Sequence, residues 1–350
     1  MLLNLIHNVL LFVILIAFAV YLFIISYKFR EENRYGFNSV LLTASILLFL
    51  AFIILSIDWL LPYPLNAAIN IWIGIISLVQ CIYYIIMRIK FKETGDKENI
   101  EESSYENGEI KVKRELLRKS FHSVIILVIF CYYYFAPWIN RVIFQVYLDG
   151  PDLYHSIWNI TEYPLPPTTS SDLEVVFSWT LMLFISALLL LLIPDAFRIY
   201  NRKYSIFSGV YKKVIRLKEL YTVGPQIYLT LGCTFIFLLA VLGIFIPSVT
   251  LAAMLIAAFG DAAAAIFGRK YGKHRFKTVF QKDELKSYEG LIAGFLVSYF
   301  SAFFIVGPWI ALMGALTFTV LDLLNPNVAD NVSNPILCTL VMMIPYWITI

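Results

Sequence analysis

Ten apolar runs, most of them about 20 residues long, constrain the fold of this chain more than any other feature of its sequence. A helix of that length spans the hydrocarbon core of a bilayer. Hydrophobic residues make up 60% of the 350 and charged residues 15%, which excludes a soluble enzyme with a single anchor. We therefore predict an all-α polytopic membrane protein with about ten transmembrane helices. The predicted spans are residues 3–26, 38–57, 66–87, 120–138, 173–194, 223–246, 248–267, 289–306, 308–323 and 336–350, of which the last three are short.

The lysines and arginines are distributed very unevenly among the loops between these runs. If the N-terminus faces outside, 26 of the 27 lie in predicted inner loops, and Arg141 alone lies in an outer one. Basic residues accumulate in the cytoplasmic loops of membrane proteins. We therefore predict an outside N-terminus and an active site at the cytoplasmic face. The predicted inner loops are residues 28–37, 88–119, 195–222, 268–288 and 324–335.

The polar chemistry is concentrated in the C-terminal two thirds of the chain. The first apolar run has neither the basic n-region nor the cleavage site of a signal peptide, so we expect a retained helix. Residues 91–113 include a mixture of Lys, Glu, Gly, Asn and Ser, which indicates a flexible cytoplasmic linker. This linker separates an N-terminal three-helix transmembrane region (1–90) from a predicted catalytic transmembrane domain (114–350).

Three smaller features complete the general description. Cys81, Cys131, Cys233 and Cys338 all fall within predicted spans without metal-ligand spacing, so we expect buried free thiols. The modest net charge of +3 does not indicate a nucleic-acid partner. In the predicted outer loop, the tripeptide Asn159-Ile-Thr161 matches a glycosylation acceptor, although such tripeptides are common by chance.

The segment 260–274 places an acid near the end of an apolar helix and follows it with a basic, glycine-containing stretch. A charged residue within the bilayer costs about 2.5–3.5 kcal/mol, so Asp261 is expected to be functional. The four-residue glycine spacing also fits a helix-dimer motif, but the basic residues between the glycines favour a loop that contacts a polyphosphate. The sequence differs from a P-loop, because the spacing is one residue short and His274 follows the lysine. The candidate phosphate contacts are Gly268, Arg269, Gly272, Lys273 and His274.

Two further motifs flank predicted spans on the same side of the membrane. Lys286 and Glu289 lie at the entry of the 289–306 span. Arg118, Lys119 and His122 lie at the start of the 120–138 span, where a purely structural role in orienting the chain is the alternative for the two cations. His122 would lie inside an apolar helix and therefore needs a partner.

Asp195 and Arg198 lie at the inner end of the 173–194 span, three residues apart. The pair has two interpretations: a structural clasp between the two side chains, or part of a functional site. Glu219 is a weaker candidate of the same kind. Asp322 and Asp330-Asn331, taken alone, are typical of an ordinary solvated turn.

Together these motifs resemble the CTP-dependent lipid kinases, a family that includes dolichol kinases, phytol kinases and CTP-using diacylglycerol kinases. The resemblance covers roughly residues 114–345. It depends on Arg118-Lys119-x-x-His122, Asp195-x-x-Arg198, Gly260-Asp261 with the following basic glycine segment, Lys286-Ser-x-Glu289-Gly and the late Asp330-Asn331. Asp322 departs from the pattern, since the family has a glutamate there.

The resemblance implies transfer of the γ-phosphate of CTP to a lipid alcohol, with Mg²⁺ held by Asp261 and Asp195, or with Glu289 in place of Asp195. Among acceptors a long polyprenol of the dolichol type is favoured, which would give dolichyl phosphate, the lipid carrier of glycosylation. The base is left open among Asp195, Glu289 and His122. The implied CTP and phosphate contacts are Arg118, Lys119, Arg198, Lys286 and the residues of the 268–274 segment.

Two other functions are compatible with the same sequence. A phosphatidate-type cytidylyltransferase has a similar signature and would make a CDP-lipid. A secondary transporter fits the number of helices, but the acids here gather at one face and no internal repeat is visible. The expected location is an integral, multi-pass protein of the plasma membrane in a prokaryote or of the endoplasmic reticulum in a eukaryote. The oligomeric state is left open.

Overall fold

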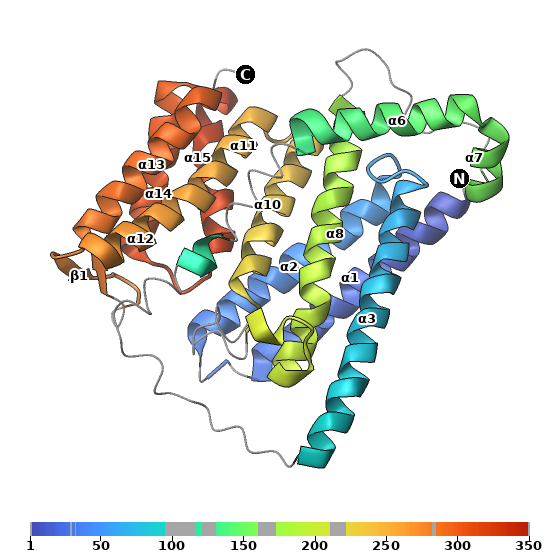
Figure 1. Ribbon diagram of the computed structural model, residues 1–350. Coiled ribbons are helices and arrows are strands. Elements are labelled where there is room, and N and C mark those ends of the chain that lie inside the picture. The colour runs from blue at the N-terminus through green and yellow to red at the C-terminus, as the bar shows by residue number, and fades with distance from the viewer. Residues whose placement is uncertain are drawn as a thin grey trace.

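Helices make up almost all of the regular structure in the computed structural model (Figure 1). It describes residues 2–28, 30–31, 33–94, 116–120, 131–159, 173–210, 222–281 and 285–348. The helices that precede the central region are α1 (Leu2–Lys28), α2 (Arg34–Ser56), α3 (Leu65–Thr94), the π-helix η3 (Cys131–Phe135), α6 (Ala136–Asp149) and α7 (Pro151–Trp158). They are followed by α8 (Leu173–Tyr200), the 3-10 helix η4 (Arg202–Tyr204), α10 (Pro225–Val241), α11 (Pro247–Leu255), the π-helix η6 (Ile256–Gly260) and α12 (Asp261–Tyr271). The chain continues with the antiparallel strands β1 (Arg275–Lys277) and β2 (Leu285–Ser287), then α13 (Tyr288–Val306), α14 (Pro308–Leu324) and α15 (Asp330–Ile348).

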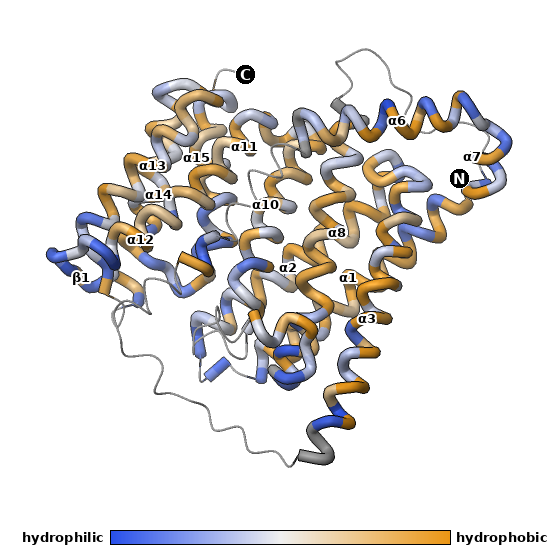
Figure 2. The backbone as a smooth tube through the Cα atoms, viewed as in Figure 1, coloured by the Kyte–Doolittle hydropathy of each residue, from blue (hydrophilic) through white to orange (hydrophobic). Residues whose placement is uncertain are grey.

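Seven helical segments of the described chain are long and apolar enough to cross a membrane. They are α1, α2, α3, α8, the continuous α11–η6–α12 segment, α13 and α15, while α10 and α14 are shorter apolar helices. Hydrophobic residues predominate along these helices (Figure 2). These helices make the protein an all-α, multi-pass membrane protein.

The region after the predicted 120–138 span differs from expectation. We expected an outer loop from residue 139 to residue 172, but residues 139–149 continue α6, and α7 occupies Pro151–Trp158. Prolines lie in the first turn of both helices, where the missing N–H costs nothing. Trp179 of α8 donates a hydrogen bond to Asn140 of α6 (3.0 Å), and α6 runs across the end of α8 (Figure 1). Residues 121–130 and 160–172 lie outside the described ranges.

The N-terminal helices pack directly on the C-terminal ones. Buried side chains of α1, α2 and α3 belong to one hydrophobic core with those of α8, α10 and α11. The Tyr21 hydroxyl of α1 donates to the Ala196 carbonyl of α8 (2.8 Å), and Gln80 of α3 donates to the Tyr204 carbonyl (2.6 Å). Helix α3 extends to Thr94, four residues into the predicted linker, and the remainder of that linker lies outside the described ranges.

Small residues allow α12 and α13 to approach closely. A Cβ atom on Gly290 would lie 2.7 Å from the Ala264 carbonyl oxygen and 2.9 Å from the Gly268 Cα atom. Gly268 is therefore part of a helix contact, and the loop that we predicted to begin there starts after Tyr271 instead. The alternative interpretation of Gly268 as part of a helix-packing motif therefore agrees with the structure, because residues without side chains let two helices pack at short range.

The cysteine prediction is confirmed in part. Cys233 and Cys338 are buried free thiols, and Cys81 is free as well. Cys81 is exposed, however, because α3 packs on the bundle along one side only.

Candidate active site at one end of the bundle

Asp261 begins α12 at the point where a π-helical turn interrupts the helix that spans residues 247–271. π-Helical turns inside α-helices often occur at functional sites. Lys119, from the short helical segment 116–120, forms an ion pair with the Asp261 carboxylate. The two residues are 142 positions apart in sequence and both are buried. A buried charge needs such a partner, because leaving one charge unpaired costs several kcal/mol.

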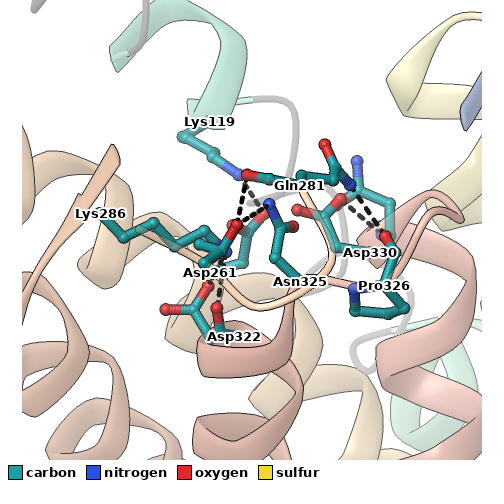
Figure 3. A network of polar contacts seen from close by, with 10 residues as sticks. Lys119, Asp261, Gln281, Lys286, Asp322, Asn325, Pro326 and Asp330 are labelled. Atoms are coloured by element: carbon teal, nitrogen blue, oxygen red, sulfur yellow. Dashed lines mark hydrogen bonds and ion pairs between the residues drawn. The ribbon is translucent and has the colours of Figure 1, made fainter. Parts of the chain in front are cut away.

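A second ion pair lies beside the first. The Lys286 ammonium of β2 contacts the Asp322 carboxylate of α14 at 2.6 Å and also donates to the Asp322 backbone carbonyl at 2.9 Å. The Lys286 and Asp322 side chains keep 22% and 14% of their surfaces exposed, so this pair is accessible from solvent. Figure 3 shows Lys119 and Lys286 pointing toward the two neighbouring aspartates, with Asp330 beyond Asn325.

Three carboxylates and two ammonium groups therefore share this region. Burial alone would lower the pKa of Lys286, but the Asp322 carboxylate, with smaller contributions from two other aspartates, outweighs burial and raises that pKa above its usual value. The other two aspartates are Asp330 and Asp261. Two lysines and three aspartates leave one negative charge, which favours the approach of a cation over that of an anion.

Loops on either side fix the cluster in place. The Thr278 hydroxyl donates to the Gln281 carbonyl (2.6 Å), and the Gln281 side chain donates to the Pro326 carbonyl (2.8 Å). Asn325 ends α14 in the left-handed conformation and donates to the Thr278 hydroxyl (3.4 Å). These contacts join the stretch between the two strands to the loop that connects α14 and α15 (Figure 3). The loop positions Asp330 at the first turn of α15.

Glu289 connects the segment after α12 to the start of α13. Its carboxylate lies 2.7 Å from the His274 Nδ1 atom and accepts the His274 backbone N–H at 3.2 Å. The Ser287 hydroxyl caps α13 by accepting the Gly290 N–H (3.1 Å). Lys286, Ser287 and Glu289 thus have separate tasks within one short motif: ion pairing, capping and anchoring of the basic segment.

Asp195 and Arg198 are not part of this cluster. The Asp195 carboxylate accepts from Arg198 Nε (2.5 Å), from Arg198 Nη2 (3.1 Å) and from the Gly224 N–H (3.0 Å). Arg198 also donates to the Thr222 carbonyl. Asp195 is fully buried and Arg198 is 1% exposed. These contacts agree with the structural clasp, which we call the α8–α10 clasp, and they use the carboxylate that was predicted to hold the metal.

The remaining predicted residues have different surroundings. Arg118, which precedes Lys119 in the sequence, is buried. Arg269, Lys273 and His274 follow Asp261 and are exposed to solvent. Gly272 ends α12. His122 and Glu219 lie outside the described residues.

Asp322 and Asp330 belong to this cluster, although neither was given a site role from the sequence. Taken alone, both are typical of an ordinary turn, and only the family resemblance includes their positions. Asp322 also lies near the end of an apolar helix, as Asp261 was expected to, and that signal identifies it. The position of Asp330 beside the cluster depends on the path of the 325–329 loop.

The carboxylates at this site suit a metal ion that takes only one or two of its ligands from the protein. Among the residues that the structure describes, no group of three or more His, Cys, Asp or Glu side chains is arranged to hold a metal ion alone. Mg²⁺ commonly uses only one or two carboxylates and takes its other ligands from water and substrate phosphates. Asp261 and a neighbouring aspartate fit that mode, whereas Asp195 does not, because its oxygens are already engaged in the clasp.

Comparison of the chain with protein-family models, with curated proteins and with solved structures gave no match.

Proposed function

We propose that this membrane protein is a CTP-dependent lipid kinase that transfers the γ-phosphate of CTP to the hydroxyl group of a long polyprenol. The single observation that carries the proposal is the cluster of Lys119, Asp261, Lys286 and Asp322, with Asp330 beside it, at the end of apolar helices. A lipid alcohol in the bilayer and a nucleotide in water can meet only at such a boundary. The motif resemblance supplies the choice of CTP and of a dolichol-type acceptor.

The chemistry of phosphoryl transfer suits this charge arrangement. The reaction needs positioned groups and electrostatic stabilisation more than covalent catalysis by the protein. Lys119 and Lys286 neutralise aspartates in the structure, and the partly exposed Lys286 ammonium is the one that a polyphosphate reaches from solvent. Arg118, Arg269, Lys273 and His274 are the further cationic candidates for the nucleotide phosphates. Mg²⁺, when bound through Asp261, would neutralise phosphate charge.

The proposed step is a single in-line displacement. The alcohol oxygen attacks the γ-phosphorus, the bond from that phosphorus to the bridging β–γ oxygen breaks, and CDP leaves. The hydroxyl proton passes to a carboxylate, for which we propose Asp330. Within the described residues, Asp330 has no lysine or arginine ion partner, and its carboxylate accepts a single backbone N–H at 2.8 Å. Glu289 is the second choice, since its carboxylate is engaged by His274.

The topology belongs to the same proposal. We propose about ten spans with the N-terminus outside and the cluster at the cytoplasmic face, in the plasma membrane of a prokaryote or the endoplasmic reticulum of a eukaryote. The uneven distribution of lysine and arginine supports this orientation. The α6–α7 pair would then lie on the outer side, at the end of the bundle away from the α1–α2 turn (Figure 1).

The position of a radiolabel tests the reaction directly. Purified protein is incubated in detergent with a long polyprenol, Mg²⁺ and CTP labelled at either the γ- or the α-phosphate. The kinase transfers only the γ-label to lipid. Transfer of the α-label to a supplied lipid phosphate would instead establish a cytidylyltransferase, and solute uptake into proteoliposomes without CTP turnover would establish a transporter. γ-Label transfer to diacylglycerol or a short prenol alone would contradict the polyprenol assignment while leaving the kinase class intact.

A further inference from the structure

We propose that the turn between α1 and α2 forms a binding pocket for a phosphate group, and that this pocket borders the candidate active site. An open pocket of about 800 Å³ lies at this turn. Its lining residues are Arg30, Glu31, Arg34, Phe37, Asn38 and Asn327. Five of these belong to the N-terminal region, to which neither the motifs nor the proposed reaction assigns any role.

The pocket shares a loop with the Asp261 cluster. The Asn38 side chain of α2 donates to the Asn327 backbone carbonyl (3.0 Å), and the Ala329 N–H donates to the Ser39 hydroxyl of α2 (2.8 Å). The same loop begins at Asn325 and leads to Asp330, two residues of the network in Figure 3. A ligand in the pocket therefore contacts the segment that positions Asp330.

The start of α2 is held firmly at this place. Asn33 caps α2 by accepting the Gly36 N–H at 2.8 Å. Gly36 packs so closely on the chain before α10 that a Cβ atom would lie 2.5 Å from the Thr222 Cγ2 atom. Thr222 in turn accepts a hydrogen bond from Arg198 of the α8–α10 clasp. Arg34, in the first turn of α2, is thus presented from a packed helix start.

The side chains favour a phosphate ligand. Guanidinium groups bind phosphate oxygens through paired, charge-assisted hydrogen bonds, and the pocket contains two of them. Glu31 opposes this charge only weakly, because its contact with Arg30 is long (3.4 Å) and its side chain is 84% exposed. The lining residues therefore carry a net charge of +1, from two arginines and one glutamate, and the asparagines add neutral hydrogen-bonding groups.

Two sources can supply the phosphate: the nucleotide or the headgroup of an anionic phospholipid. The nucleotide source rests on the proposed kinase function, whereas the lipid source does not. Direct binding measurements distinguish them without requiring turnover. The protein is placed in phosphatidylcholine nanodiscs for calorimetric titration with CTP, and separately its retention of phosphatidylglycerol is measured by native mass spectrometry.

The test variant is Arg30→Ala/Arg34→Ala, and the matched control is Arg88→Ala. Arg88 is exposed near the end of α3 and does not line the pocket. We expect the double variant to weaken binding of one probe by about 10-fold or more, because both guanidinium groups that would donate charge-assisted hydrogen bonds to the phosphate are removed. Arg88→Ala should leave both affinities unchanged. Glu31→Gln should tighten the same interaction, by about 2-fold, because a weakly competing exposed charge is removed.

Each outcome decides the proposal. Weaker binding of CTP alone identifies the nucleotide as the source, and weaker retention of phosphatidylglycerol alone identifies the lipid headgroup. Unchanged binding of both probes in the double variant, with an unchanged melting temperature, overturns the pocket. If wild-type protein binds no CTP but loses lipid through the arginine substitutions, the pocket stands and the kinase proposal fails. If the double variant turns over CTP normally and binds both probes as the wild type does, the kinase proposal stands and the pocket fails.

Discussion

The α8–α10 clasp and the Asp261 cluster both pair acids with bases in the helical bundle, yet their contacts differ. The clasp joins Asp195 to Arg198, three residues away, and to backbone groups of residues 222–224. The cluster joins residues 142 and 36 positions apart, through Lys119–Asp261 and Lys286–Asp322. The clasp is sealed, whereas the cluster keeps part of its charged surface exposed.

Under the proposed function, this difference separates a structural ion pair from a ligand-binding one. A carboxylate whose oxygens are engaged by its own helix and by backbone N–H groups has little capacity left for a ligand. The Lys286–Asp322 pair joins distant segments and keeps part of its charged surface exposed to solvent, as the proposed function requires. An acid and a base in a motif are therefore not enough to identify a site, and their partners and exposure decide between the two roles.

The largest expected effect is the loss of stability when the clasp is broken. In Asp195→Ala, Arg198 remains charged and sealed from water, so the free energy of unfolding should fall by about 3–5 kcal/mol. Reversible denaturation in mixed detergent micelles measures this change. The control Asp195→Ala/Arg198→Leu removes the stranded charge and should recover most of the stability. Wild-type stability in Asp195→Ala, together with lost turnover, would instead place Asp195 in the active site.

Asp261→Asn should lower turnover, and it should also lower the melting temperature, because the buried Lys119 ammonium loses its counter-charge. The asparagine oxygen can still accept a hydrogen bond from Lys119, but the charge for binding a cation is lost. We expect turnover to fall by about 10²–10³-fold, the range observed when one key electrostatic group is removed from an active site. Transfer of γ-label to polyprenol, normalised to the amount of folded protein, measures it. Near-normal turnover would mean that the metal site has been misplaced.

The Lys286–Asp322 pair should show a smaller energetic coupling than the clasp. A double-mutant cycle with Lys286→Met and Asp322→Asn should give an interaction energy of about 0.5–3 kcal/mol in unfolding measurements. Part of the pair is exposed to water, which weakens the attraction between the two charges. Strictly additive single-variant effects would show that the contact contributes nothing to stability.

Lys273→Ala should have the smallest effect of the four. Lys273 is exposed, so its attraction to a phosphate is screened and contributes about 0.2–1 kcal/mol. The apparent KM for CTP should therefore rise by no more than about 5-fold while kcat changes little. Steady-state kinetics over a range of CTP concentrations separates the two parameters. An unchanged KM would argue against contact between Lys273 and the nucleotide.

The sequence predicted the apolar helices well because hydrophobic length alone determines them. The predicted span 289–306 corresponds to α13, and the predicted span 66–87 lies within α3. The α6–α7 pair was missed because both helices are short and contain polar residues, so no long apolar run identifies them. The span prediction at 120–138 continues into α6, and part of it lies outside the described residues.

The candidate site was predictable in its residue types but not in its pairings. Asp261 and Lys286 could be identified because charge is costly near apolar helices. Their partners Lys119 and Asp322 depend on how distant helices pack, which no local pattern records. Gly268 was assigned to a phosphate-binding loop because basic residues follow it, whereas close packing against Gly290 keeps it inside α12.

The most direct test of the difference between the two regions is γ-label transfer from CTP to a long polyprenol, normalised to the amount of folded protein. Wild-type protein is compared with Asp261→Asn and with Asp195→Ala/Arg198→Leu. A functional cluster and a structural clasp predict background transfer for the first variant and nearly wild-type transfer for the second. Retained transfer in Asp261→Asn, with transfer abolished in the folded clasp variant, would contradict this assignment.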